Sequence, residues 1–183
     1  MDNGASSYRR FLDGDASAFD EILKEFKDNL IFFIDHYVHD MAAAEDIAID
    51  VFAELLVHRH RYNFKVQLKT YLFMLGRSRA LNYIKHRDKY RMVEYADAEA
   101  ELIYRENVED SVLADERKKI VNEAIEKLSE EMREVIHLIY FENLSYEEAA
   151  KVMKKNKKQI DNLLYRAKSA LRTILGKEGE QLI

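Results

Sequence analysis

Residues 144–172 read LSYEEAAKVMKKNKKQIDNLLYRAKSALR, a pattern that predicts two helices separated by a short polar turn. Ser145 and Glu148 have the spacing of a capping box, in which the hydroxyl accepts from an early backbone N–H and the carboxylate accepts from the N-cap N–H. Asn156 and Gln159 repeat this spacing after the lysine-rich turn. A short helix, a turn and a longer helix are typical of a helix-turn-helix.

The second of these helices has two chemically different faces. Apolar side chains recur on one side at helical spacing: Ile160, Leu163, Leu164, Ala167, Ala170, Leu171, Ile174 and Leu175. Basic and polar side chains fall on the other side: Lys158, Asn162, Tyr165, Arg166, Ser169 and Arg172. Residues 151–172 hold eight cations and one acid, whereas the whole chain has a net charge of −5. Because a solvated helix normally mixes both signs, this balance favours DNA binding over an ordinary surface helix.

The composition predicts a soluble, all-helical protein of the reducing cytoplasm. The 183 residues include no Pro and five Gly, so few positions break a helix, and 48% hydrophobic residues suffice for a packed core. The absence of Cys excludes disulfides and thiolate metal sites. No apolar run approaches the roughly 18 residues of a membrane span. The first ten residues lack the apolar core of a signal peptide, so we expect no membrane insertion.

Apolar periodicity predicts three helices in the first half of the chain. The polar residues 1–15 are expected to be loosely ordered. Helices are expected from residue 16 to residues 37–40, from about residue 43, and over residues 68–91. In the second helix the expected inward positions are Ile47, Val51, Phe52, Leu55 and Leu56. The same helix carries Asp46, Asp50 and Glu54 at a spacing of four, which destabilises an isolated helix and indicates use by a group outside it.

A basic and aromatic stretch covers residues 58–91, which hold ten cations and one acid. Aromatic residues lie among these charges, including Tyr62, Phe64, Tyr71, Tyr83 and Tyr90. Cations attract phosphates and aromatic faces stack on unpaired bases, so the combination favours a nucleic-acid surface over a protein-binding face. Helical spacing assigns four residues of this stretch to the core: Tyr71, Leu72, Leu75 and Leu81.

An acidic segment separates this stretch from the end of the chain. Residues 93–116 hold nine acids and one cation, so we expect a linker between two domains, residues 1–92 and 117–183. In the second domain helices are expected through Leu128 and through Phe141, and Asn143 is expected at a helix end that needs positive φ. The predicted fold is all-α, with two small helical domains and a helix-turn-helix in the second.

Motifs for catalysis and metal binding give no positive case. Glu134 and His137 form one Glu-x-x-His, whereas a four-helix di-iron site needs two. His36, His39 and Asp40 also cluster, but no third helix offers obvious further ligands. The chain has no glycine-rich phosphate loop and no nucleophile elbow. We expect no enzyme activity, no metal and no cofactor.

The sequence resembles the extracytoplasmic-function group of bacterial RNA polymerase sigma factors. The resemblance runs from about Ala16 to Leu175, and its strongest parts are AEDIAIDVF (44–52), LKTYLFMLGRSRALNYIK (68–85) and residues 128–172. It implies a promoter-specificity subunit whose first domain binds core RNA polymerase and the −10 element, and whose second domain reads the −35 element. Promoter DNA and an anti-sigma factor are further partners that the family implies.

The resemblance assigns residues to each of these contacts. Core polymerase is expected at Asp46, Ile47, Ile49, Asp50, Val51, Phe52 and Glu54. The −10 DNA is expected at Arg59, Arg61, Asn63, Lys65, Lys69, Arg77, Arg79 and Asn82. The −35 DNA is expected at Lys157, Lys158, Gln159, Asp161, Asn162, Tyr165, Arg166 and Lys168.

The sequence departs from the family pattern in three places. Ile49 stands where a Gln is usual, which removes one polar polymerase contact. Lys154 and Lys155 replace a Gly and an apolar residue, and because a left-handed Lys costs about 1 kcal/mol, a turn of different shape is expected. Asp161 and Leu163 replace basic or polar residues, so the −35 sequence preference of relatives does not transfer.

Two other functions remain open from the residues alone. A helix-turn-helix regulator that acts without being a polymerase subunit predicts a palindromic site and DNA binding without polymerase. A helical adaptor or metal protein built on the histidines predicts tight metal uptake. The basic and aromatic stretch at residues 58–91 favours a sigma factor over both.

Overall fold

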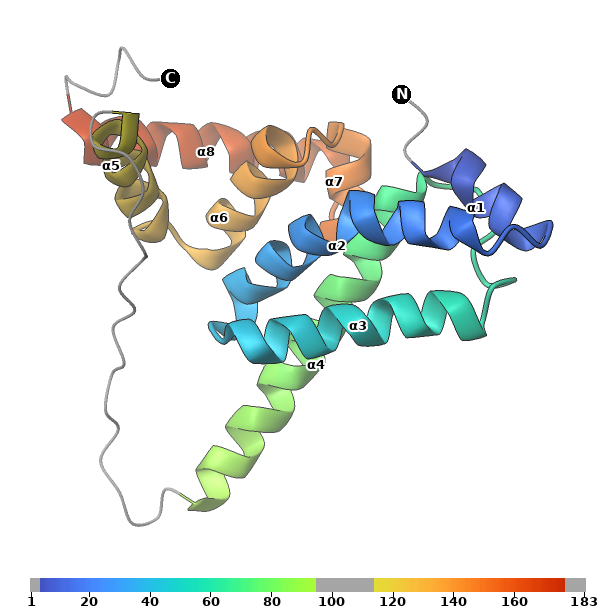
Figure 1. The fold of residues 1–183 in the computed structure, drawn as a ribbon. Coiled ribbons are helices and arrows are strands. Elements are labelled where there is room, and N and C mark those ends of the chain that lie inside the picture. The colour runs from blue at the N-terminus through green and yellow to red at the C-terminus, as the bar shows by residue number, and fades with distance from the viewer. Residues whose placement is uncertain (1–3, 95–113, 177–183) are drawn as a thin grey trace.

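Helices form every secondary-structure element that the computed structural model describes. The structure describes residues 4–94 and 114–176, with side chains for residues 4–89 and 120–176. The elements are α1 (Ala5–Leu12), α2 (Ser17–Val38), α3 (Met41–Val57), α4 (Leu68–Glu94), α5 (Ala114–Glu126), α6 (Glu130–Ile136), the π-helical turn η1 (His137–Phe141), α7 (Tyr146–Met153) and α8 (Lys157–Leu175) (Figure 1). The all-α prediction is confirmed over these residues.

Two predictions about chain organisation meet the limits of the described residues. Most of the predicted acidic linker, residues 95–113, lies outside them. Helix α5 begins at Ala114, within the range predicted as linker. None of the described helices combines the length and the apolarity needed to cross a membrane.

A two-residue connection makes α2 and α3 antiparallel neighbours (Figure 1). His39 ends α2 in the left-handed region, with φ 51°. Asp40 then caps α3, because its Oδ1 accepts the backbone N–H groups of Ala42 and Ala43 at 3.0 and 3.2 Å. This cap starts α3 at Met41, two residues before the apolar periodicity predicts it.

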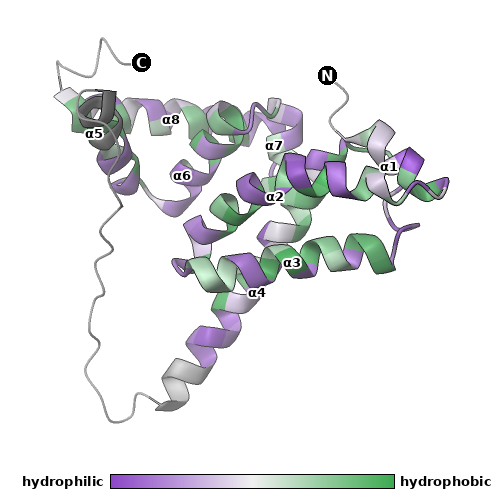
Figure 2. Cartoon of the chain, in the orientation of Figure 1, coloured by the Kyte–Doolittle hydropathy of each residue, from purple (hydrophilic) through white to green (hydrophobic). Residues whose placement is uncertain are grey.

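Helix α4 packs closely on α2 because a glycine lies at the contact. A Cβ added at Gly76 would lie 2.8 Å from Leu30 Cδ1, which is inside van der Waals contact. Figure 2 shows that α4 is of mixed hydropathy where it packs and hydrophilic beyond, toward its C-terminal end. The packed half of α4 is therefore fixed in place, and it is the half that carries the candidate DNA residues.

The prediction that residues 1–15 are loosely ordered is wrong. They include α1, whose Tyr8 and Phe11 are 0% and 8% exposed. The polar composition of this segment does not predict a helix. Two buried aromatic side chains one turn apart nevertheless anchor α1 to the core. Two inward assignments are also wrong, because Leu56 and Leu81 are exposed.

Both predicted capping boxes are present in the C-terminal helices. Ser145 Oγ accepts the Glu148 N–H at 3.3 Å and Glu148 Oε2 accepts the Ser145 N–H at 2.9 Å. Asn156 Oδ1 accepts the Gln159 N–H at 2.9 Å, and Gln159 Oε1 accepts the Asn156 N–H at 2.8 Å. The predicted inner face of α8 is buried at Ile160, Leu163, Leu164, Ala167 and Leu171, whereas Ile174 is exposed near the helix end.

The turn between α7 and α8 keeps a left-handed residue despite the missing glycine. Lys154 has φ 53°, so the expectation of a different turn shape is wrong. Two contacts of the next residue compensate: the Lys155 N–H donates to the Ala150 carbonyl at 2.9 Å, and Lys155 Nζ lies 2.7 Å from Glu131 Oε1. Asn143 has φ 54°, as predicted.

The helical group α1–α4 and the helical group α5–α8 lie against each other. Figure 1 shows α7 beside the N-terminal part of α4, and their buried side chains belong to one continuous cluster. The sequence does not predict this arrangement.

We expect Asp40→Ala to lower the free energy of unfolding by about 1 kcal/mol, because α3 loses the acceptor for two N–H groups. Urea denaturation measures the change. Asp40→Asn is the matched control, since its amide oxygen keeps the acceptor, and it should remain within a few tenths of a kcal/mol of wild type. Equal losses in the two variants would mean that charge, and not capping, matters at this position.

Candidate nucleic-acid interface

The residues predicted to contact the −35 DNA lie together on α8. Seven of the eight side chains are exposed and Lys168 is half-buried. Tyr165 is 73% exposed, which is unusual for an aromatic side chain with no place in the core. Within the protein, Lys157 pairs with Glu147 at 2.6 Å and Lys168 Nζ lies 5.2 Å from the centre of the Tyr140 ring. The remaining cations, Lys158 and Arg166, point outward from a rigid, well-capped helix.

The segment 58–67, between α3 and α4, is an ordered loop built on aromatic rings. Tyr62 is buried and its hydroxyl donates to the Val66 carbonyl at 2.7 Å. The rings of Phe64 and Tyr71 lie 4.7 and 5.2 Å from the Tyr62 ring. Phe64 has φ 61°, an unusual value for a bulky residue. Four side chains of the predicted −10 set are exposed on this loop: Arg59, Arg61, Asn63 and Lys65.

The rest of the predicted −10 set lies along α4 and points in three directions. Asn82 is exposed. Arg79 reaches α3, where its Nη2 lies 2.6 Å from Glu54 Oε2 and its Nη1 lies 3.2 Å from Asp50 Oδ2. Lys69 and Arg77 point toward the C-terminal helices. Apart from Asn82, the set is therefore divided between the exposed loop, where Arg61 also pairs with Glu54, and α4 cations that are paired with acids.

Helix α3 uses part of its acidic strip within the protein. Glu54 receives Arg79 and also Arg61, whose Nη1 lies 2.5 Å from Glu54 Oε1. The hydrogen bond from Arg79, with that from Arg61, holds the pKa of Glu54 below its ordinary value despite partial burial. These cations offset the repulsion that the spacing of the acids creates.

The other residues predicted for core polymerase divide into a surface and its support. Asp46, Ile49 and Asp50 are exposed, whereas Ile47, Val51 and Phe52 are buried beneath them. Ile49 is 59% exposed, and Leu56 and Val57 add exposed apolar area nearer the end of α3. The accessible face of α3 is thus both acidic and apolar, which is typical of a protein contact.

A buried carboxylate, that of Glu142, joins the two helical groups. The Glu142 side chain is 3% exposed, and its Oε2 lies 2.8 Å from Lys69 Nζ and 3.2 Å from the donating Nδ2 of Asn29. Lys69 Nζ also donates to the Glu142 backbone carbonyl at 2.7 Å. Burial by itself would raise the pKa of Glu142, but the neighbouring His137 and Lys69 side chains outweigh burial, so this pKa lies below its ordinary value.

A second ion pair crosses the same boundary. Arg77 donates through Nε to Glu134 Oε1 at 2.7 Å and through Nη2 to Oε2 at 3.4 Å. Burial raises the pKa of Glu134 although Arg77 acts in the opposite direction. We call the two pairs, Lys69–Glu142 and Arg77–Glu134, the polar seam. Two cations of the predicted −10 set are therefore occupied by acids of the C-terminal group.

Sequence reasoning missed the role of Glu134 and Glu142 in the seam. The Glu-x-x-His spacing of Glu134 and His137 points only to metal ligands. In the described part of the chain, no three His, Cys, Asp or Glu side chains gather as a metal site. A usable signal was present: Glu142 directly follows a helical turn, where a negative charge opposes the helix dipole and calls for a nearby cation.

Comparisons with known proteins agree with the two helical groups. The protein-family model "Sigma-70 region 2" matches residues 22–90, and "Sigma-70, region 4" matches residues 118–171. The RNA polymerase sigma-H factor of Pseudomonas aeruginosa is 27% identical over 168 residues, covering 86% of this chain and 86% of that protein. The ECF RNA polymerase sigma factor SigM of Bacillus subtilis is 24% identical, covering 85% of this chain and 93% of that protein.

Two solved structures share the fold. The sigma factor RpoE of Bartonella quintana, in complex with the anti-sigma factor NepR, matches with a TM-score of 0.67 at 22% identity, covering 86% of this chain and 96% of that chain. CnrH in complex with the cytosolic domain of CnrY matches with a TM-score of 0.62 at 20% identity, covering 94% of both chains.

We expect Glu142→Gln to lower the free energy of unfolding by about 3 kcal/mol at neutral pH, because it leaves the largely buried Lys69 without a counter-charge. The pKa of Glu142 is lowered in the folded protein. Its stabilisation is therefore present above the ordinary value of 4.5 and is lost as pH falls through the lower folded-state value. Urea unfolding of wild type and variant should show a difference that shrinks below pH 4.5.

Glu126→Gln is the matched control for this experiment. Glu126 pairs with Arg133 at 2.7 Å within the C-terminal group, but its side chain is 61% exposed. The expected loss is below about 1 kcal/mol. Equal losses at the two positions, or a Glu142→Gln deficit that grows on acidification, would contradict the assigned role of the buried carboxylate.

Proposed function

Because the chain belongs to the extracytoplasmic-function group of bacterial RNA polymerase sigma factors, we propose that its two helical groups bind two different forms of promoter DNA. As a sigma factor it directs promoter-specific initiation of transcription. Matches to both the region 2 and the region 4 models favour this function over a helix-turn-helix regulator that acts without polymerase. The single observation that carries the proposal is the presence of exposed cations at two separate places, the loop 58–67 and the outer face of α8.

Helix α8 is proposed to enter the major groove of the −35 duplex. Asn162 and Arg166 are one turn apart on its exposed face, so both can reach base edges from one groove position. Lys157 and Lys158 lie at the helix N-terminus, where they suit phosphates on one side of the groove. Asp161 is exposed next to Asn162, and its carboxylate suits a cytosine amino group better than a phosphate.

The loop 58–67 is proposed to hold the unpaired −10 strand. Its exposed cations suit phosphates and its aromatic rings suit unstacked bases. Lys69 and Arg77 belong to the same proposed surface but are paired across the polar seam. Full engagement of the −10 strand therefore requires the two helical groups to separate, with phosphates replacing the carboxylates of Glu142 and Glu134.

The exposed face of α3 is proposed to bind core polymerase. Asp46, Ile49 and Asp50 lie on this face, and Leu56 and Val57 extend it. The side chains of Ile47, Val51 and Phe52 support the face from the core. Ile49 replaces one polar contact by apolar area, which agrees with the exposed apolar neighbours.

Partners and location follow from the family. The structures of RpoE and CnrH contain the anti-sigma factor NepR and the cytosolic domain of CnrY. We propose that an anti-sigma factor likewise controls this protein in the cytoplasm, and that the protein performs no bond chemistry itself. The core polymerase catalyses RNA synthesis, and this subunit positions the polymerase at the promoter.

The experiment that tests the proposal is a pull-down with core RNA polymerase, followed by run-off transcription on genomic fragments. We expect a stable complex and transcripts that begin at a small set of sites. Absence of polymerase association would remove the proposal, and specific binding to a palindrome without polymerase would support the regulator instead.

A finer prediction concerns the double variant Asn162→Ala with Arg166→Ala. It removes two base-reading side chains that the core does not use, so −35-dependent initiation should fall by at least tenfold, about 1.4 kcal/mol. Polymerase association should persist. Thr173→Ala, on the exposed end of the same helix, is the control and should initiate normally. Loss of association together with initiation would show that the face of α8 has a structural role.

A further inference from the structure

Helix α1 lies outside the residues that the family models match, yet it packs directly on the loop 58–67. The region 2 match begins at residue 22, whereas α1 ends at Leu12. Figure 1 shows α1 beside the connection from α3 to α4. An element in this position can affect whatever the loop binds.

Tyr8 fixes α1 to the loop. Its side chain is fully buried, and its hydroxyl donates to the Arg59 carbonyl at 2.8 Å, with the Leu55 carbonyl at 3.2 Å. Its ring meets the Tyr62 ring edge-on at 5.2 Å. Burial raises the pKa of Tyr8 to about 12, so the hydroxyl stays protonated and remains a donor. The start of the loop is therefore held by α1 as well as by α3.

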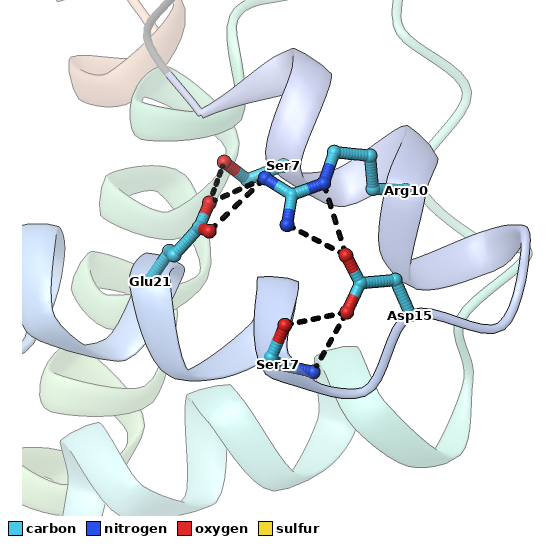
Figure 3. Close-up of polar contacts among 5 residues, drawn as sticks. All are labelled: Ser7, Arg10, Asp15, Ser17 and Glu21. Carbon is cyan, nitrogen blue, oxygen red and sulfur yellow. Dashed lines mark hydrogen bonds and ion pairs between the residues drawn. The ribbon is translucent and has the colours of Figure 1, made fainter.

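Arg10, the next cation of α1, pairs with acids and does not contact the loop. Figure 3 shows Arg10 between Asp15 and Glu21. Its Nη2 lies 2.6 Å from Asp15 Oδ2, and its Nη1 lies 3.0 Å from Glu21 Oε2. Ser7 Oγ also donates to Glu21, and Ser17 Oγ donates to Asp15. This exposed network ties α1 to the start of α2 and neutralises the charge of Arg10.

Arg9 differs from its neighbour in both direction and partner. One residue along a helix turns the side chain by about 100°, and Arg9 lies over the loop, with its guanidinium carbon 5.1 Å from the centre of the Phe64 ring. Its side chain is exposed, and no ion pair with an acid is found for it among the residues that the structure describes. A cation stacked on an aromatic ring keeps its outer N–H groups available for an anion.

We propose that Arg9 is part of the surface that holds the unpaired −10 strand, where its guanidinium contacts a backbone phosphate. Phe64 carries Arg9 on one face and is held at a positive φ, with Tyr62 on another side, so the ring and the cation have fixed positions. Exposed cations then flank the aromatic rings from α1 and from the loop itself. Tyr8 is a positioning residue, since it touches the loop and not the DNA.

This inference rests on the proposed function, so its test includes a residue of the proposed −10 surface. The full-length chain is assembled with core polymerase, and the probe is a fork DNA built from the strongest promoter recovered by run-off transcription, with the −10 strand unpaired. Affinity is measured across a range of salt concentrations for wild type, Arg9→Gln, Arg9→Lys, Arg10→Gln and Lys65→Gln. Thermal unfolding of each variant is measured in parallel.

The expected result is specific to charge at residue 9. A phosphate contact on a single strand contributes a slope of about 0.7 to the dependence of log affinity on log salt. Arg9→Gln should lower the slope by about this amount and weaken binding by about fivefold at ~0.1 M salt. Arg9→Lys should restore most of the slope. Arg10→Gln should lower the melting temperature while leaving the slope unchanged.

Two results overturn the proposal, and they are distinguishable from each other. If Lys65→Gln lowers the slope and Arg9→Gln does not, Arg9 only braces Phe64, and the proposed function of the loop stands. If neither variant changes the slope although the wild-type complex binds the fork, the proposed −10 surface is wrong, and with it the role of Arg9.

Discussion

The buried carboxylate of Glu142 determines how the two helical groups are related. It receives Lys69 and Asn29 from the first group and His137 from its own. Removing one partner leaves a charge in the interior, which is strongly unfavourable, whereas separating the groups exposes both charges to water. A polar seam is therefore sensitive to substitution of one side, but it opens at lower cost than a purely apolar boundary of the same size. This property suits domains that must separate to function.

The seam also reduces the number of free cations in a chain of net charge −5, which lowers the general attraction for nucleic acid expected from its basic surfaces. Lys69 and Arg77 are neutralised by Glu142 and Glu134, and Arg79 by the acids of α3. The cations of the loop 58–67 and the outer face of α8 remain exposed. In the proposed function the exposed set makes the first contacts, and polymerase supplies the free energy to exchange internal carboxylates for phosphates. These exposed cations therefore do not take part in the seam.

The features that the sequence predicted correctly are those encoded by neighbours in the chain. The capping boxes at Ser145 and Asn156 and the positive φ of Asn143 depend on residues within one turn, so spacing suffices to find them. Tyr8 and Glu142 were missed because their partners lie 51 and 73 residues away, and no local pattern reports such distances. Lys154 shows the converse. The cost of a left-handed Lys predicts a turn of different shape, but Lys154 is left-handed in the structure. Contacts of Lys155 with Ala150 and Glu131 stabilise this turn.

The wide turn η1 is the backbone feature that makes the seam possible. In a regular α-helix, residues five apart point about 140° away from each other. Here the Glu142 N–H donates to the His137 carbonyl at 3.0 Å, which is the five-residue bond of a π-helical turn. The wider turn brings the two side chains to the same side, with His137 Nε2 3.3 Å from Glu142 Oε1. His137 in turn lies 4.9 Å, ring to ring, from His36 of α2. One additional residue in the turn thus directs both the Glu142 carboxylate and the His137 imidazole toward the first helical group. Sequence reasoning depends on regular helical periodicity, which places these two residues on different faces.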